Sequence, residues 1–220
     1  MKKQIKKILS RSDWDTVKIQ ENHEPLVEIK DTEKLKTGLI KKLYNPSFFV
    51  RKTVAEKLYK VSEKLPQGIN LVLIEGYRDI KSQQESWDRK FNKLKKENPK
   101  WSDEKIEQQV RLVVAKPSPL ANHNCGGAID VALVHLDGKL LDFGTLYPSE
   151  AMGVEWYEKF KMFSNKITEE QKTNRKILRE AMETENFVWY PGEWWHYCWG
   201  DRMWAVYSKK TECFYGPAGL

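Results

Sequence analysis

At residues 127–134 the chain reads Gly127-Ala128-Ile129-Asp130-Val131-Ala132-Leu133-Val134. This short apolar run, rich in branched side chains, predicts a buried β-strand that presents one carboxylate, Asp130. The dipeptide Asp137-Gly138 comes next and is a strong signal for a two-residue hairpin turn. The chain from Leu140 onward is therefore predicted to return as an antiparallel neighbour of this strand.

Two other parts of the chain also predict strands. Residues 69–74 form a second apolar run with branched side chains, which is typical of a buried strand. In the C-terminal part, residues 187–190, 193–199 and 203–207 alternate and are rich in aromatic side chains, with a turn at Gly200-Asp201. We predict an aromatic β-hairpin there.

Periodicity and capping residues predict the helices. Residues 47–65 carry apolar side chains at helical spacing. A charged helix follows residue 78, and its predicted inward residues are Ile80, Trp87, Phe91 and Leu94. Ser102 is predicted to cap the next helix, and a capping box at residues 168–171 begins one that runs to about residue 182.

Together these elements predict an α+β fold, in which helices pack against a small antiparallel sheet. A length of 220 residues suits one domain, so we expect residues 1–220 to form a single domain with its core at about 46–210. Residues 1–45 are mixed and polar, and their pattern predicts no particular element.

The composition is that of a folded globular protein, with 40% hydrophobic and 12% aromatic residues. The net charge is +7, but basic and acidic residues are mixed along the chain, so we expect no nucleic-acid partner. No apolar run is long enough to span a bilayer, and no membrane partner is expected. No apolar region or cleavage site follows the N-terminal lysines, which predicts a cytoplasmic location, or a periplasmic one if a leader has been removed. Three cysteines cannot all pair within one chain, so reduced thiols are expected.

The chain has only four histidines, and His123 lies in an unusual setting, seven residues before Asp130. On one unbroken strand these two side chains would face opposite sides. Gly126 and Gly127 lie between them and let the chain turn, so a loop histidine can swing over a strand carboxylate. Imidazole and carboxylate are both good zinc ligands, although such a pair is by itself a weak signal.

A second group follows at Glu193-Trp194-Trp195-His196. Pro191-Gly192 before it predicts a bend at Glu193, which leaves His196 in the strand. A ligand set of His123, Asp130 and His196 leaves one zinc position open, as hydrolases require, and Glu193 is then the nearby carboxylate that can accept a proton. Tryptophans beside a histidine are more often core packing than a substrate wall.

Three blocks carry a resemblance to a known family: Glu75-Gly76-Tyr77-Arg78, then His123-x-x-Gly126-x-Ala128-x-Asp130, then Glu193-Trp194-Trp195-His196-Tyr197. In order and spacing they resemble the D-alanyl-D-alanine dipeptidases, including the vancomycin-resistance enzymes. That family belongs with the zinc D,D-carboxypeptidases and the Hedgehog signalling domain in one superfamily. The resemblance covers about residues 70 to 207.

The resemblance implies a zinc metallopeptidase with one Zn²⁺ per chain, held by His123, Asp130 and His196. It implies that Glu193 acts as base and then acid, and that Arg78 stabilises the negatively charged oxygen formed at the scissile carbonyl. The implied substrate is D-Ala-D-Ala, a similar small dipeptide or another peptidoglycan-derived peptide.

Substrate-binding positions follow from the same resemblance. Asp142 matches an acidic position that faces the substrate ammonium group, and its alternative role is that of a turn residue. Ala121 stands where the family usually has serine near the substrate amino end, and Asp79 stands where the family usually has proline. An acid at Asp79 could weaken the field of the neighbouring Arg78 or orient its side chain.

Three alternatives remain open. The chain could be a murein D,D- or L,D-peptidase of the same superfamily, or a binding domain that keeps zinc without catalysis. Alternatively, His123 and His196 could form a structural zinc site with Cys125 and Cys198, although single-residue spacers are unusual for such sites. The sequence indicates no oligomeric state.

Overall fold

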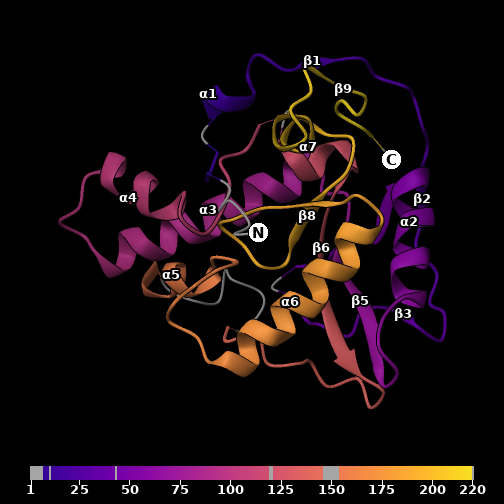
Figure 1. Ribbon diagram of the computed structural model, residues 1–220. Helices are drawn as coiled ribbons and strands as arrows, with labels where there is room; N and C mark the ends of the chain where they lie inside the picture. The colour runs from indigo at the N-terminus through magenta and orange to yellow at the C-terminus, as the bar shows by residue number, and fades with distance from the viewer. Residues whose placement is uncertain (1–6, 10, 43, 119–120, 146–153, 220) are drawn as a thin grey trace.

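A five-stranded sheet lies at the centre of the computed structural model, which describes residues 7–9, 11–42, 44–118, 121–145 and 154–219 (Figure 1). In spatial order its strands are β3 (Leu35–Thr37), β5 (Ile69–Glu75), β6 (Ala128–His135), β8 (His196–Cys198) and β7 (Val188–Trp189). β3 runs parallel to β5, and the other neighbouring pairs are antiparallel. The α+β class is confirmed, but the sheet is mixed, because β3 comes from the N-terminal part in which the sequence pattern predicted no element.

Two small sheets connect distant parts of the chain. β1 (Lys18–Ile19) pairs in parallel with β9 (Glu212–Cys213), and β2 (Leu26–Glu28) pairs antiparallel with β4 (Phe49–Arg51). The Arg51 side chain, almost fully buried, donates hydrogen bonds to the carbonyl oxygens of Cys125 (2.7 Å) and Gly216 (3.1 Å). These contacts hold the C-terminal tail and the loop of residues 121–127 against β4.

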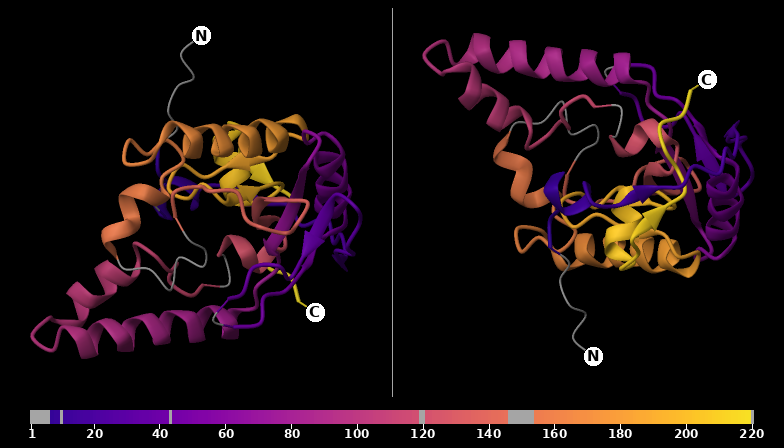
Figure 2. Two further views of the ribbon diagram at one scale, coloured as in Figure 1. Left: turned by 90° about the horizontal axis from the view of Figure 1, so that it is seen from below. Right: turned by 90° about the horizontal axis from the view of Figure 1, so that it is seen from above.

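The helices lie around the central sheet. α2 (Lys52–Glu63) packs against α6 (Glu169–Thr184) and against strands β3 and β5, while α6 also contacts β6 and β7. α3 (Ile80–Glu97) and α4 (Asp103–Val110) form a pair that extends to one side of the molecule (Figure 2). The shorter helical segments are α1 (Arg11–Trp14), η1 (Asn122–Cys125), η3 (Val154–Trp156), α5 (Tyr157–Phe160) and α7 (Arg202–Tyr207).

Several predicted boundaries agree with the structure. β5 and β6 lie within one residue of the predicted strands, and the capping box of Thr168 and Gln171 begins α6. The first long helix begins at Lys52 rather than near residue 47, because the residues before it form β4. In α3, Trp87 is buried as predicted, but Ile80 is 47% exposed, because it is the first residue of the helix and the buried side of α3 begins only at Gln83.

Two predicted strands are not strands in the structure. The chain does turn at Asp137-Gly138 and return antiparallel to β6, with an isolated bridge between Val134 and Leu140 and a hydrogen bond from the Leu141 N–H to the Leu133 carbonyl oxygen, but the return is too short to form a strand. Residues 203–207 are helical, in α7, so the hairpin consists of β7 and β8 alone. The physical reason is the Asp201 side chain, whose carboxylate accepts a hydrogen bond from the Trp204 backbone N–H at 2.7 Å and so caps the helix.

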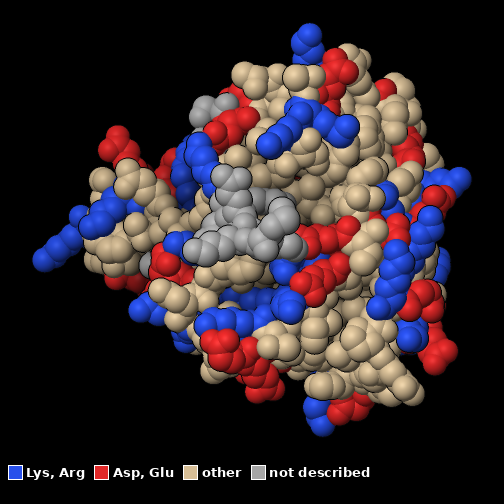
Figure 3. All heavy atoms as spheres, in the orientation of Figure 1, with Lys and Arg blue, Asp and Glu red and all other residues tan. Residues whose placement is uncertain are grey.

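The core and the surface fit a globular protein. The central strands β5 and β6 are buried almost throughout, and their side chains belong to one large apolar cluster with α2 and α6. On the face shown in Figure 3, Lys and Arg side chains are interspersed with Asp and Glu. Within the described ranges, no helix combines the length and the apolar character that crossing a membrane requires.

Candidate metal centre and active site

Three neighbouring strands each place one polar residue at the same level of the sheet. Glu75 on β5 is paired with Asp130 on β6, and Asp130 is paired with His196 on β8. Cross-strand partners have their side chains on one face, about 5 Å apart at Cβ. A β-bulge between Leu73 and Glu75 shifts the register of β5 at this point. The sheet itself therefore aligns a row of two carboxylates and one imidazole.

His123 reaches this row from the 3₁₀ helix η1. Gly126 follows η1 with a φ of 72°, in the left-handed region that favours glycine, and returns the chain toward β6. The His123 carbonyl oxygen accepts a hydrogen bond from the Arg78 backbone N–H at 3.1 Å. On the ring, Nδ1 donates to the Gly76 carbonyl oxygen at 2.8 Å, so the other ring nitrogen, Nε2, is the one that points toward Asp130 and His196.

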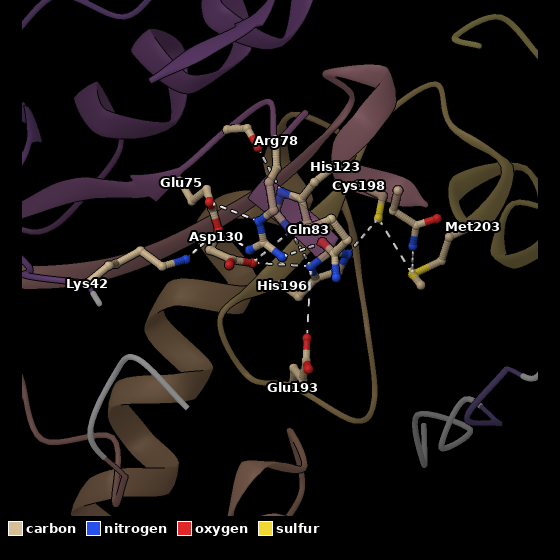
Figure 4. A network of polar contacts seen from close by, with 12 residues as sticks. Lys42, Glu75, Arg78, Gln83, His123, Asp130, Glu193, His196, Cys198 and Met203 are labelled. Atoms are coloured by element: carbon tan, nitrogen blue, oxygen red, sulfur yellow. Dashed lines mark hydrogen bonds and ion pairs between the residues drawn. The ribbon is translucent and has the colours of Figure 1, made fainter. Parts of the chain in front are cut away.

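The potential ligand atoms form a small triangle (Figure 4). His123 Nε2 lies 3.2 Å from His196 Nδ1, and Asp130 Oδ1 lies 3.2 Å from His196 Nδ1 and 3.4 Å from His123 Nε2. Tetrahedral zinc with bonds of about 2.0–2.1 Å requires ligand atoms about 3.3–3.4 Å apart, and the triangle fits that requirement. The two imidazoles lower the pKa of Asp130 well below its usual range, against the raising effect of burial, so the carboxylate is ionised and ready to bind a cation.

Glu193 lies next to this triangle without being part of it. It occupies the predicted bend before β8, and its Oε2 atom is 4.0 Å from His196 Nδ1. Its side chain keeps 30% of its surface accessible, yet loss of water around the carboxyl group raises the pKa to about 7. His196 opposes this rise and Asp130 adds to it. A cation in the triangle would lower the pKa of Glu193 again.

Arg78 is held in place by a buried carboxylate. Its Nε donates to Glu75 Oε1 at 3.0 Å, a second guanidinium nitrogen contacts Glu75 Oε2, and Nη1 donates to Gln83 at 2.7 Å. Glu75 is fully buried and is also bonded to Lys42 and to the Tyr44 hydroxyl. Burial would raise the pKa of Glu75, but Arg78 and then Lys42 lower it to about 2.

Sequence patterns alone indicated no role for Glu75, Lys42 or Gln83. One available signal was the position of Glu75, a charged residue that follows four apolar residues, 71–74, at the end of a buried strand and must find a partner there. Lys42 gave no such signal, because it lies in the N-terminal segment whose pattern predicts no element. Asp79 does not contact the Arg78 guanidinium; its carboxylate caps α3 by accepting from the backbone N–H and the hydroxyl of Ser82 at 2.8 and 2.9 Å.

A cavity of about 450 Å³ opens over this centre. On the side of the sheet it is lined by Arg78, Ala121, His123 and His196. The other lining residues include Trp14 at the end of α1, Arg111 and Lys116 in the segment after α4, and Arg202 at the start of α7. Ala121 therefore lies on the wall of the cavity, directly before η1.

Asp142 lies away from the described lining of this cavity. It is exposed, and its carboxylate accepts hydrogen bonds from the Gly144 backbone N–H at 2.8 Å and from the Gln171 side chain at 2.9 Å. These contacts are those of a turn residue that joins its loop to the start of α6. Residues 146–153, which follow this loop, lie outside the described residues.

The cysteines do not join the triangle. Cys125 Sγ donates to the Asn122 carbonyl oxygen at 2.9 Å, and Cys198 Sγ contacts His196 on the opposite ring nitrogen, Nε2. In the described ranges, the group of three or more potential ligands is His123, Asp130 and His196. The arrangement is that of an open three-ligand site rather than a closed structural one.

Comparison with known proteins places the chain among peptidases. A family model described as D-ala-D-ala dipeptidase matches residues 27–216. The D-alanyl-D-alanine dipeptidase of Enterococcus faecium is 33% identical over 154 residues, which cover 68% of this chain and 72% of that protein. That of Synechocystis sp. is 27% identical over 187 residues, or 78% of this chain and 71% of that protein.

Solved structures show more distant likenesses. The vancomycin-resistance D,D-pentapeptidase VanY is 14% identical with a TM-score of 0.46, over 90% of this chain and 96% of that one. The LD-carboxypeptidase LdcB is 16% identical with a TM-score of 0.46, over 94% and 90% of the two chains. On the extent of the family match and on the similarity to its curated relatives, the chain belongs to the D-ala-D-ala dipeptidase family of peptidases.

Proposed function

We propose that this chain is a zinc-dependent peptidase that hydrolyses D-Ala-D-Ala or a similar small dipeptide. One observation carries the proposal: the triangle of His123, Asp130 and His196 has the dimensions of a tetrahedral zinc site, and Glu193 lies beside it, with its Oε2 atom 4.0 Å from His196 Nδ1. The relatives that carry the name D-alanyl-D-alanine dipeptidase support the choice of substrate.

In the proposed reaction, Glu193 transfers the proton and Arg78 stabilises the developing charge. A bound zinc supplies Lewis-acid chemistry, which polarises the scissile carbonyl and makes water more acidic. Glu193 accepts a proton from the attacking water as the new C–O bond forms, and it returns this proton to the amine when the C–N bond breaks. The Arg78 guanidinium stabilises the charge that develops on the carbonyl oxygen, and its ion pair with Glu75 fixes where its donors point.

A murein D,D- or L,D-peptidase is the second candidate. The cavity of about 450 Å³ lies within the range of sites that enclose ligands much larger than two alanines, which favours a longer peptide. Both candidates use the same metal and the same Glu193.

A substrate panel tests the proposal. The purified, zinc-loaded protein should be incubated with dipeptides of both chiralities, with the same dipeptides blocked at the amino end, and with murein peptides that end in D-Ala-D-Ala or L-D bonds. Release of free D-alanine from unblocked D-Ala-D-Ala supports the dipeptidase. Cleavage of murein peptides alone supports the second candidate, and no cleavage of any peptide contradicts both.

A further inference from the structure

A thiol lies behind His196, on the side of the ring that faces away from Asp130. Cys198 follows His196 by two residues in β8, so both side chains stand on the same face of the sheet. Cys198 Sγ is 3.4 Å from His196 Nε2, and Cys198 is completely buried. The contact is drawn in Figure 4.

The tautomer of His196 decides which atom of this contact is the hydrogen-bond donor. Nδ1 is the nitrogen that His196 turns toward Asp130 and His123, so it must offer a lone pair if it binds a metal. In a neutral imidazole the other nitrogen, Nε2, then carries the proton. A buried N–H that lacks an acceptor is costly, and the sulfur of Cys198 is the acceptor that the structure places there.

A second sulfur links this thiol to the other histidine. Cys198 Sγ donates to Met203 Sδ at 3.6 Å, and Met203 Sδ also accepts from the Asn122 side-chain amide at 3.7 Å. Asn122 is the residue directly before His123. Met203 itself is fixed in the first turn of α7, which the Asp201 carboxylate caps.

Plain apolar packing is the competing explanation, because Cys198 and Met203 both belong to a small buried cluster with Ala128 and Trp204. Packing explains their burial but not the series of polar contacts. The Cys198 sulfur contacts a ring nitrogen of His196, and the Met203 sulfur accepts from Asn122, the residue before His123. The two sulfurs also contact each other.

We propose that Cys198 and Met203 form a sulfur relay that fixes the tautomer and orientation of His196 and couples it to the loop of His123. In this relay Cys198 is a positioning residue. The inference rests on the metal site of the proposed function and extends it to residues with no assigned role.

The relay has a chemical consequence. Histidines that bind metals usually donate their second N–H to a carboxylate or a carbonyl, which makes the imidazole a stronger ligand. His123 follows this rule through Gly76, whereas His196 donates to sulfur, a weak acceptor. His196 is therefore the less electron-rich ligand of the pair, and its orientation depends on a weaker contact.

Zinc affinity measured without substrate tests the relay. Competition with a chromophoric chelator should give a zinc Kd that is about tenfold weaker in Cys198→Ala, the lower end of the usual loss for a partner of a metal-binding histidine, because sulfur is a weak acceptor. Cys198→Ser, whose hydroxyl can accept and donate, should stay within about threefold of the unchanged protein. Met203→Leu keeps the volume but loses the acceptor, and a smaller loss of a few fold is expected.

Cys213 provides the matched control. Cys213 is 1% exposed, nearly as buried as Cys198, and its thiol donates to the Tyr215 carbonyl oxygen at 4.0 Å rather than contacting a histidine. Cys213→Ala and Cys213→Ser should leave zinc affinity unchanged. If Cys198→Ala binds zinc normally, if it loses no more than Cys213→Ala, or if Cys198→Ser is as weak as Cys198→Ala, the relay is overturned.

A cobalt-substituted sample gives a second readout. The relay requires that Cys198 is not itself a ligand, so no thiolate-to-cobalt charge-transfer band should appear; such a band would overturn it. Because none of these measurements uses a peptide, the outcomes separate. If the variants show the expected zinc affinities but no peptide is cleaved, only the proposed function is contradicted. If peptides are cleaved but Cys198→Ala binds zinc as tightly as the unchanged protein, only the relay is contradicted.

Discussion

Asp130 and His196 are direct cross-strand partners in the antiparallel pair β6–β8, and their facing atoms Oδ1 and Nδ1 lie 3.2 Å apart. The pair is set by strand register, because a slip of one residue would turn either side chain to the other face of the sheet. Two of the three proposed metal ligands are thus positioned by backbone hydrogen bonds, and only His123 depends on a loop.

We expect about one tightly held zinc per chain, as three protein ligands typify catalytic sites. Elemental mass spectrometry of the native protein after dialysis measures this stoichiometry. Asp130→Asn should reduce it strongly, since the amide removes the ligand charge. Treatment with a strong chelator should abolish peptidase activity and re-addition of zinc should restore it, whereas full activity of metal-free protein would contradict the metal site.

Changing Glu193→Gln should leave zinc in place and lower kcat by on the order of a hundredfold or more, because the amide cannot accept a proton from water. Steady-state kinetics and metal analysis of the same sample measure both effects. Glu180→Gln, an exposed carboxylate on α6, is the control and should change neither. Loss of zinc together with activity in Glu193→Gln would instead identify Glu193 as a ligand.

Changing Arg78→Ala should reduce kcat far more than it raises KM, because the charge that Arg78 stabilises develops in the transition state. Arg78→Lys should recover only part of the loss, since an ammonium group cannot reproduce the paired donors of the guanidinium held by Glu75. If kcat is unaltered in Arg78→Ala, Arg78 does not stabilise the transition state and its role is the structural ion pair with Glu75.

The Glu75 ion pairs predict a pH-dependent stability. The pKa of Glu75 is about 2 in the folded chain against 4.5 as its ordinary value, so its contribution is complete above about pH 4.5 and is lost as the pH falls toward 2. Glu75→Gln should be less stable than the unchanged protein at neutral pH. The difference should shrink by on the order of 3 kcal/mol on full acidification. Urea unfolding of the metal-free proteins from pH 7 to pH 2 measures it, and a difference that is constant with pH would contradict the assignment.

Ala121 lies on the cavity wall, where a serine hydroxyl could accept a hydrogen bond from a substrate ammonium group. We predict that Ala121→Ser lowers KM for D-Ala-D-Ala with little change in kcat. The gain in binding free energy should be at most that of one hydrogen bond to a charged group, roughly 1–3 kcal/mol. A dipeptide blocked at its amino end is the control and should gain nothing. If KM for unblocked D-Ala-D-Ala does not change, the amino end does not lie beside Ala121.

Local patterns in the sequence predicted the elements that carry most of the site. Strands β5 and β6 are short apolar runs, and the bend before His196 follows from Pro191-Gly192; each depends on a few neighbouring residues. The segment 203–207 was predicted wrongly because a short aromatic run fits a strand or a helix, and the Asp201 cap decides between them.

What local patterns could not predict are contacts between distant segments. The pairing of Lys42 with Glu75 joins residues 33 positions apart, and it comes from a segment without periodicity. Strand β3 and its parallel pairing with β5 have the same origin. The relay between Cys198 and Met203 needed both the register of β8 and the helical conformation of α7, of which the second was predicted wrongly.

The separation of the three ligand positions along the chain affects how the polypeptide can chelate an ion. Asp130 and His196 are 66 residues apart, and His123 and His196 are 73 residues apart. An unfolded chain would have to close loops of that length to present all three groups at once, and the entropy that this costs grows with loop length. A chain with the right residues but with β8 undocked is consequently a poor chelator. Metal retention would then report that β8 has docked, and it could separate native molecules from partly folded ones of the same sequence.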